Sequence, residues 1–480
     1  VALVVSKRKE TLPEIKNLVE VDYEEMIPLT SCEAALAEGA PAIHEKGNIL
    51  SHEHLVRGNA DEVLANSAFV VTEHYSVPIN EHAFMEPECA IAQPEGEGIL
   101  LFSAGQSIYD EQREVARMLG LDKEKIHVQS KLVGGGFGGK EDMSVQHHAS
   151  LAAWLLKKPV KVLLSREESL MVHPKRHGME MDFTTGCDEE GNLTAMKAVI
   201  YADTGAYASL GGPVLQRACT HAAGPYKYQT IDVEGFAVYT NNPPAGAFRG
   251  FGVCQTAFAI ESNLNLLAEK VGLSPWEIRF KNAVAPGDTL PNGQLVSKNA
   301  ALKEALLAVK DGYEQAEVAG ISSFFKNSGV GVGLPDTGRC IISVEEGKIH
   351  VRTSAACIGQ GMATVTTQIA CETLNLPPEM IVAEAPDTRR TPNSGTTTAS
   401  RQSLFTGEAT RRAAMQLRYE LDMGRALSDL EGEEFYGEYS AKTDPLINDK
   451  KSPVSHAGYG YAAEVAILDD KGKVAKFVAA

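Results

Sequence analysis

The segment Val133–Glu141 constrains the fold most, because five of the six positions 134–139 are glycine. A strand-like stretch, Ile126–Val133, precedes it, and a helix-like stretch, Met143–Leu156, follows. Glycine lets a backbone approach a ligand closely and point several N–H groups at it. The sequence therefore predicts a ligand-binding loop between a strand and a helix.

Strand-like and helix-like segments alternate along the rest of the chain, which predicts a mixed α/β (α+β) fold. The 480 residues exceed one ordinary core, so we expect several domains. The expected parts are a small α/β unit at 1–57 and two larger mixed α/β domains at 61–320 and 329–480. The further elements expected are strands at 68–75, 161–165, 194–201, 233–239, 347–353 and 459–468, and helices at 256–271, 362–374 and 407–421.

The N-terminal part is expected to read strand, helix, strand: Val1–Val5, Lys9–Leu18 and Val19–Tyr23. A polar stretch at Asn48–Arg57 is expected to be a linker. The chain starts in an apolar strand without Met and stops in another at 473–480. We therefore expect a fragment or subunit of a larger assembly.

Composition excludes several classes of function. The net charge of −18 gives no electrostatic footprint for nucleic acid or an anionic membrane surface. The sequence contains no run of about 18 apolar residues, so no membrane span is expected. The eight cysteines form no Cys-x-x-Cys pair, so neither an iron–sulfur cluster nor structural zinc is expected. A reducing cytoplasm is the simplest location.

The glycine loop also matches two nucleotide-binding patterns. Gly134-x-Gly136-x-x-Gly139 fits a dinucleotide fingerprint, and Gly134-x4-Gly139-Lys140 fits most of a phosphate loop. Glu141 replaces the hydroxyl residue that a phosphate loop needs for Mg²⁺. No acidic residue about 20 positions on supports the dinucleotide pattern. A structural glycine turn is the third alternative.

Four other segments could carry chemistry. Ala245–Gly252 presents one arginine among small and aromatic residues, and Cys357–Met362 contains Gly-Gln-Gly before a helix. Thr391–Ser403 is a hydroxyl-rich loop suited to a phosphorylated ligand. Asn80–Glu88 clusters Glu81, His82, Glu86 and Glu88, but its spacing fits no standard zinc pattern.

Together and in this order, these five segments resemble the xanthine dehydrogenase and aldehyde oxidase family of molybdenum hydroxylases. The resemblance covers essentially the whole chain. It implies a partial hammerhead-like α/β unit followed by two molybdopterin-binding domains, the second incomplete. It also implies a molybdenum–molybdopterin cofactor and leaves open whether the pterin carries a cytosine nucleotide.

The resemblance implies that Gly136, Phe137 and Gly138 lie beside the molybdenum, with backbone amides near its oxo ligand. Arg249 offers its backbone amide near the pterin and metal. No side chain of this chain is expected to ligate the metal directly.

Other cofactor contacts follow from the same resemblance. Gln360 binds the pterin, and Asn80 stands where the family usually has a glutamine bonded to the oxo group. The loop 396–403 lines the dithiolene and phosphate tail. Its expected contacts are Ser400, Arg401 and Gln402.

Glu141 and Arg217 are the expected catalytic and substrate-binding pair, because purine-hydroxylating relatives resemble this chain there. A heterocycle needs an acceptor and a charged donor, whereas an aldehyde needs neither. Arg217 would stabilise negative charge developing on the ring. Phe251 would stack on it, although the usual second aromatic is missing from 331–334.

The implied reaction is oxidative hydroxylation of a purine-like heteroaromatic carbon by water. The segments 329–340 and 353–361 resemble bacterial selenium-dependent xanthine dehydrogenases. The family's general base, a glutamate in a Val-Gly-Glu segment, is absent, and Glu408 belongs to another motif. Nicotinate or aldehyde hydroxylation, a phosphate-loop protein and a catalytically inactive scaffold are the alternatives.

Electrons would leave through iron–sulfur and flavin centres. This chain lacks the cysteines for the former, so other domains or subunits must supply both. A homo-oligomeric complex is expected.

Overall fold

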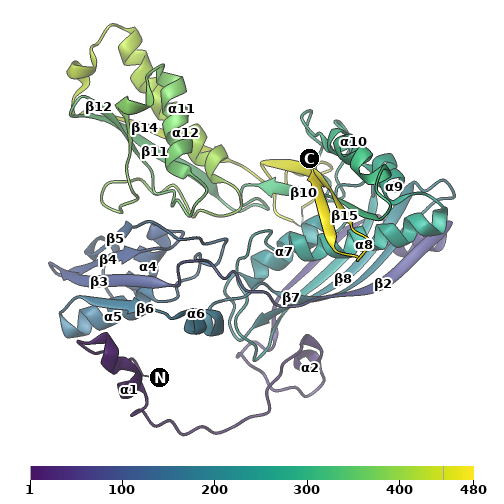
Figure 1. The fold of residues 1–480 in the computed structure, drawn as a ribbon, viewed down its shortest axis with the longest axis horizontal. Helices are drawn as coiled ribbons and strands as arrows, with labels where there is room; N and C mark the ends of the chain where they lie inside the picture. Colours follow the sequence, from purple (N-terminus) through teal and green to yellow (C-terminus); the bar gives the residue numbers. More distant parts are fainter. Residues whose placement is uncertain (1, 447) are drawn as a thin grey trace.

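The computed structural model describes residues 2–446 and 448–480 and has the mixed α/β fold that the sequence predicts (Figure 1). Four sheets, each packed against helices, make up the chain. Two of them face one another across the functional site. Among the described residues, no helix combines the length and apolarity needed to cross a membrane.

The largest sheet has five strands, and helices α7 and α8 cover one of its faces. Strand β7 shows why it forms: Met179, Met181 and Phe183 are buried and alternate with polar residues, the period of a half-buried strand. Gly272 ends α8 at φ +81°, as expected for a left-handed helix stop. In pairing order the strands are β1 (Ile49–Arg57), β9 (Thr230–Tyr239), β8 (Leu193–Gly205), β7 (Gly178–Cys187) and β2 (Phe69–Val77); the helices are α7 (Gly211–His221) and α8 (Val253–Val271).

A four-stranded sheet carries the 133–141 loop. Its apolar face packs on α4 and α5 around a separate core that includes Leu101, Val128 and Ala149. Its strands, in pairing order, are β5 (Ile126–Ser130), β4 (Gly98–Ser103), β3 (Cys89–Glu95) and β6 (Val160–Leu163); the helices are α4 (Ile108–Leu119), α5 (Gln146–Leu156) and α6 (Arg166–Val172).

A second four-stranded sheet packs on α11 and α12 and forms with them the upper lobe of Figure 1 (residues 336–441). The sheet that carries the 133–141 loop forms the lower lobe with α4 and α5. The extended 384–401 connection of the upper lobe runs along β5 of the lower lobe: Ser130 N–H donates to Pro386 (2.9 Å) and Thr388 N–H donates to Val128 (3.0 Å). These bonds join the lobes directly. The elements are β13 (Ile381–Ala383), β12 (Lys348–Arg352), β11 (Asp336–Glu345), β14 (Glu434–Ala441), α11 (Met362–Leu374) and α12 (Gln402–Asp422).

A three-stranded sheet completes the fold and shares its core with α9 and α10. Ser274 and Glu277 form a capping box that starts α9. The elements are β10 (Ala319–Ser328), β15 (Gly458–Leu468), β16 (Val474–Ala479), α9 (Pro275–Asn282) and α10 (Leu302–Glu314).

The N-terminal part differs from its predicted elements. Residues 2–5 and 19–23 form no strand, and Leu3, Val5 and Val21 are exposed because no sheet lies beside them. Residue 1 lies outside the described residues. The expected helix appears as η1 (Lys9–Thr11) and α1 (Leu12–Lys16).

The prediction of a linker at 48–57 is wrong. This stretch forms β1, which pairs antiparallel with β9; its polar side chains lie on the exposed side of a sheet edge. The short helices α2 (Cys32–Leu36) and α3 (Ala60–Ala65) flank it. The division into parts 1–57, 61–320 and 329–480 stays a prediction.

Candidate functional site

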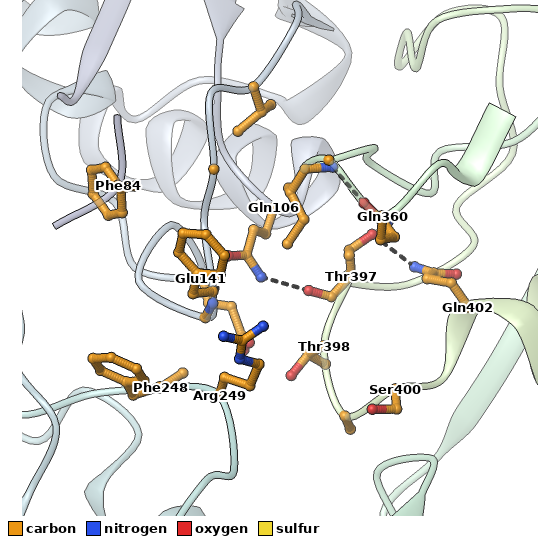
Figure 2. Close-up of a pocket in the computed structure, with 18 of the residues that line it drawn as sticks. Phe84, Gln106, Glu141, Phe248, Arg249, Gln360, Thr397, Thr398, Ser400 and Gln402 are labelled. Carbon is orange, nitrogen blue, oxygen red and sulfur yellow. Dashed lines mark hydrogen bonds between the residues drawn. The ribbon is translucent and has the colours of Figure 1, made fainter. Parts of the chain in front are cut away.

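A cavity of about 1020 Å³ lies between the lobes and is lined by all five segments singled out in the sequence. The 133–141 and 246–252 loops come from the lower lobe and the large sheet. The segments 358–365 and 397–403 come from the upper lobe (Figure 2). Residues 83–85 belong to the fifth segment. Segments scattered over the sequence thus converge on one site.

The two glycine-rich loops pack backbone against backbone. Arg249 N–H donates to the Phe137 carbonyl at 2.7 Å. Gly138 has φ +101°, and a Cβ there would lie 3.0 Å from the Ala247 carbonyl oxygen. Only glycine adopts this conformation and allows this approach without strain. Phe137, Gly138 and Arg249 therefore line the cavity together.

Gln106 is a wall residue that the sequence analysis missed. It is buried just before α4, and its Oε1 accepts from Gly138 N–H at 3.1 Å. Its Nε2 donates to the Thr397 carbonyl at 2.6 Å (Figure 2). One side chain thus holds the 133–141 loop and the 391–403 loop. The signal was present: Gly105-Gln106-Ser107 forms a strand-to-helix turn, with Ser107 as the helix cap.

The upper-lobe residues expected to bind the cofactor line the cavity: Gln360, Ser400, Arg401 and Gln402. The Gln360 amide is folded onto its own loop, accepting from Ile358 N–H (2.6 Å) and donating to the Ala356 carbonyl (3.0 Å). Arg401 is buried, and its Nε donates to Asp336 at 2.6 Å. Arg401 therefore holds the loop in shape through its guanidinium.

The first turns of α11 and α12 also face the cavity, through Met362, Val365, Gln402 and Ser403. Helix N-termini carry partial positive charge and free N–H groups, which favour anionic ligands. Thr398 and Ser400 add hydroxyl groups to the same wall. This wall suits a phosphorylated, anionic cofactor.

Glu141 lines the cavity from the 133–141 loop. Burial raises its pKa to about 8, an effect reinforced by the charges of Asp142 and Asp110 and opposed by a hydrogen bond from Thr398. Its carboxyl group is therefore mostly protonated at pH 7 and can donate as well as accept a hydrogen bond.

Of the residues expected to bind substrate, Phe251 reaches the cavity surface and Arg217 does not. Phe251 lines the cavity. Arg217, on α7, is buried behind the wall: its Nη1 lies 2.7 Å from His456 Nε2, and its Nη2 donates to the Val330 carbonyl. Burial lowers the pKa of Arg217 to about 10.

Besides Arg217, two predicted residues lie outside the cavity lining. Asn80 is exposed, and its carbonyl accepts from Arg176 N–H at 2.8 Å. Gly136 lies within the loop but faces Gln106, where a Cβ would approach Oε1 to 2.5 Å. The structure therefore places Gln106, and not Asn80, next to Gly138.

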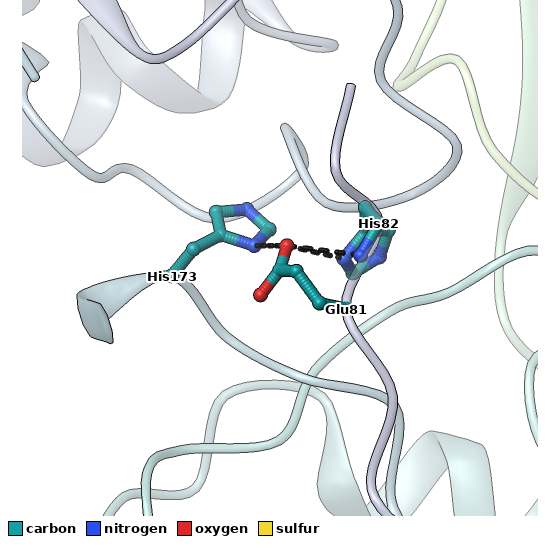
Figure 3. A group of neighbouring side chains, drawn as sticks. All are labelled: Glu81, His82 and His173. Carbon is teal, nitrogen blue, oxygen red and sulfur yellow. Dashed lines mark hydrogen bonds and ion pairs between the residues drawn. The ribbon is translucent and has the colours of Figure 1, made fainter. Parts of the chain in front are cut away.

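Beneath the loops, Glu81, His82 and His173 form a buried cluster (Figure 3). His82 Nε2 contacts the Ala247 carbonyl and His173 Nε2 contacts the Gly139 carbonyl, both at 2.8 Å. A carbonyl only accepts, so each Nε2 carries hydrogen. Each histidine thus holds one glycine-rich loop, and Glu81, paired with Lys175, lies between them.

The position of the Lys140 side chain is evidence against the phosphate-loop alternative. Its ammonium group is buried, lies 2.7 Å from Glu86 Oε2 and sits over the Phe84 ring. It does not line the cavity. A phosphate-loop lysine must instead reach the bound phosphates.

Comparisons with known proteins agree with this geometry. Two family models, each described as a molybdopterin cofactor-binding domain, match residues 43–283 and 297–472. The chain belongs to the molybdopterin-binding subunits of the xanthine dehydrogenase and aldehyde oxidase family.

Relatives and structures support this membership. A probable xanthine dehydrogenase subunit of Bacillus subtilis (strain 168) is 37% identical over 86% of the chain. The nicotinate dehydrogenase large molybdopterin subunit of Eubacterium barkeri is 38% identical over 66% of the chain and 76% of its own length. The aldehyde oxidoreductase of Desulfovibrio gigas superposes with TM-score 0.88 at 26% identity, over 96% of this chain.

The chain spans 57% of the Bacillus subtilis relative and 54% of the Desulfovibrio gigas protein. Within that span the cavity fits a molybdopterin. The glycine loops leave room that a Cβ would fill, two helix N-termini would favour an anionic group, and amide and hydroxyl groups in the lining could hydrogen-bond to it.

Proposed function

We propose that this chain forms the cofactor-binding part, and part of the substrate pocket, of a molybdenum hydroxylase. The proposed reaction is oxidative hydroxylation of a purine-like heteroaromatic carbon, with water as the oxygen source. The observation that carries this proposal is the convergence of 133–141, 246–252, 358–362 and 397–403 on one cavity. The shared family supports it.

The chain's residues have separate tasks in this proposal. When bound, the molybdenum cofactor supplies the two-electron oxidation of the ring carbon. Gln106 takes the place that we expected of Asn80, since its amide lies against Gly138. Gln360 and the 397–403 loop hold the cofactor's edge and tail. Phe251 packs on the substrate ring, and Glu141 hydrogen-bonds to its heteroatoms.

Proton abstraction is not assigned to these residues. The printed sequence contains no Val-Gly-Glu segment. Glu408 lies on α12 and pairs with Arg411 and Arg412, outside the cavity lining. Interactions with these arginines lower its pKa to about 2, too low for an effective base at neutral pH. The groups described here therefore bind and orient.

A nicotinate hydroxylase is the second candidate. The support is the similarity to the Eubacterium barkeri protein and the absence at 331–334 of the second aromatic that would stack on a purine ring together with Phe251. Aldehyde oxidation fits less well, because Glu141 would lack a heteroatom partner.

For the complete enzyme we propose iron–sulfur and flavin centres on partner domains or subunits, a homo-oligomeric assembly and a cytoplasmic location. All eight cysteines are free thiols, which fits a reducing compartment. The similarity of 329–340 and 353–361 to selenium-dependent relatives supports a selenium-dependent branch.

Metal analysis of the complete assembly tests the proposal. Made in a host that assembles the cofactor, it should contain about one molybdenum per copy of this chain and should hydroxylate hypoxanthine, xanthine or nicotinate. Stoichiometric zinc or magnesium without molybdenum would refute the cofactor assignment. No molybdenum and no other stoichiometric metal would support the scaffold alternative, whereas full molybdenum without turnover on any heteroaromatic compound would refute the proposed reaction.

A further inference from the structure

Two basic side chains, one lining the cavity and one behind its wall, lie close enough for their charges to interact. Lys326 lies near the end of β10 and lines the cavity. Arg217 lies behind it on α7; burial, together with the positive charge of Arg217, lowers the pKa of Lys326 to about 7. Cys254, at the start of α8 beside the 246–252 loop, is the third neighbour. This wall adjoins the loop that carries Phe251.

Neither positive group has an acidic partner. Lys326 Nζ donates to Asn327 Oδ1, and Arg217 contacts His456 and the Val330 carbonyl. Across residues 2–446 and 448–480, no carboxylate oxygen lies within 4.0 Å of either group. Arg217 Nε is buried with no hydrogen-bond partner there. Buried charge is costly when uncompensated.

The nearby acidic residues do not neutralise Lys326 or Arg217, because one is already ion-paired and the other is protonated. Asp336, whose charge acts on Arg217, pairs with Arg401 at 2.6 Å and accepts from Val330 N–H at 2.7 Å. Glu141, which also lines the cavity, is mostly protonated at pH 7 because burial raises its pKa to about 8. The Lys326 wall therefore has no ionised carboxylate of its own, and an external anion bound there would favour the charged form of Lys326.

We propose that Lys326, supported by Arg217, binds a negatively charged group on the substrate, so that the preferred substrate is an anionic heteroaromatic compound. This inference rests on the proposed function. Two sources share the chemistry: a carboxylate attached to the ring, or an oxo-purine that has lost a ring proton. In this arrangement Phe251 packs on the ring, and Lys326 binds the negatively charged group.

The test uses the complete molybdenum-loaded enzyme with Lys326→Met, Lys326→Arg and the control Lys270→Met. Lys270 is an exposed lysine on α8 outside the cavity lining. Equilibrium binding and kcat/KM are measured for nicotinate against its neutral amide, and for xanthine over the range from pH 6 to pH 9. Molybdenum content is measured for every variant.

Lys326→Met should weaken binding of the anion about 10- to 100-fold, the range of one charge-assisted contact, and change the neutral amide less than about 2-fold. Lys326→Arg should recover most of the loss, and Lys270→Met should lose nothing. An effect on nicotinate alone identifies the carboxylate. An effect on xanthine that is largest between pH 6 and pH 9 identifies the ring anion, because Lys326, whose pKa is lowered to about 7, loses its charge as the ring gains one.

Equal losses on charged and neutral ligands, or none, would overturn the proposal. So would loss of molybdenum in Lys326→Met, which would assign Lys326 to the anionic cofactor. Lys326-dependent anion binding by an enzyme that turns over no heteroaromatic compound would uphold the site and refute the proposed reaction instead.

Discussion

Gln106 Nε2 donates a 2.6 Å hydrogen bond to the carbonyl of Thr397, a residue 291 positions further along the chain. The same amide accepts from Gly138 N–H through Oε1. A single buried residue therefore connects the two walls of the cofactor cavity. Its backbone adds to the side-chain bonds, because its carbonyl accepts from Thr397 N–H at 3.0 Å and its N–H donates to the Lys140 carbonyl at 2.8 Å.

Gln106→Leu should lower molybdenum content several-fold. It leaves the Gly138 N–H and the Thr397 carbonyl without their partner, at a cost of about 1–3 kcal/mol. Mass-spectrometric metal analysis and urea unfolding measure the two effects. Gln112→Leu is the matched control: Gln112 is buried on α4, the helix that follows Gln106, and bonds the Ile126 carbonyl (2.7 Å) away from the cavity. Equal metal loss in both variants would show a general stability effect.

Gly138→Ala should also reduce metal content and activity sharply. The new Cβ would press on the Ala247 and Phe248 backbone at 3.0–3.1 Å, so the two glycine loops must separate. Gly287→Ala tests backbone strain alone, because Gly287 has φ +91° with open space around it. If both variants keep full metal, the close approach of the loops is unimportant.

Glu141→Gln should remove a pH dependence of substrate binding centred near pH 8. Since burial raises the pKa of Glu141 to about 8, the wild type loses its proton donor as the pH rises through 8, whereas glutamine donates at every pH. Affinity for a dead-end heterocycle between pH 6 and 10 measures this.

Glu111→Gln separates binding from stability. Burial also raises the pKa of Glu111 to about 8, but Glu111 lies outside the cavity lining. For both acids the folded pKa exceeds the unfolded value of 4.5. The fold therefore favours the protonated form of each side chain. The contribution of this form to stability is complete below pH 4.5 and is lost as the pH rises through 8. Glu111→Gln should flatten that fall and leave the binding profile unchanged.

Glu261→Gln should destabilise the fold by about 3–5 kcal/mol in urea unfolding, because it leaves a buried guanidinium without its counter-charge. Glu261 on α8 pairs with the fully buried Arg279 at 2.7 Å and accepts from Ser323 N–H at 2.8 Å. Asp422→Asn, which breaks an exposed pair with Arg418, should cost no more than about 0.5 kcal/mol.

The sequence predicted elements wherever the hydrophobic period was clear. The helix at 362–374 and the stop at Gly272 are confirmed to the residue. It failed at 48–57, because an edge strand with polar outward side chains looks like a linker until its partner β9 is known. Residues 19–23 alternate in the way expected of a strand but form none, because a strand also needs a neighbouring strand to pair with.

The site shows the same division. Glycine-rich loops were found because their composition is unusual. Gln106 was missed because its importance depends on Thr397, almost 300 residues away, and no local pattern encodes that distance. The reverse holds for Arg217, whose charge is visible in the sequence but whose place behind Lys326 is not.

The backbone bonds between β5 and the 386–388 segment join chain positions about 260 residues apart. Closing so long a loop is entropically costly until each lobe has folded, so this seam should form late. A ligand that spans the cavity binds only the closed form and therefore holds it shut. Loading the cofactor and docking the lobes thus become one equilibrium. Protein lacking the cofactor should open more often along the seam and be cut first by proteases in the 384–401 connection.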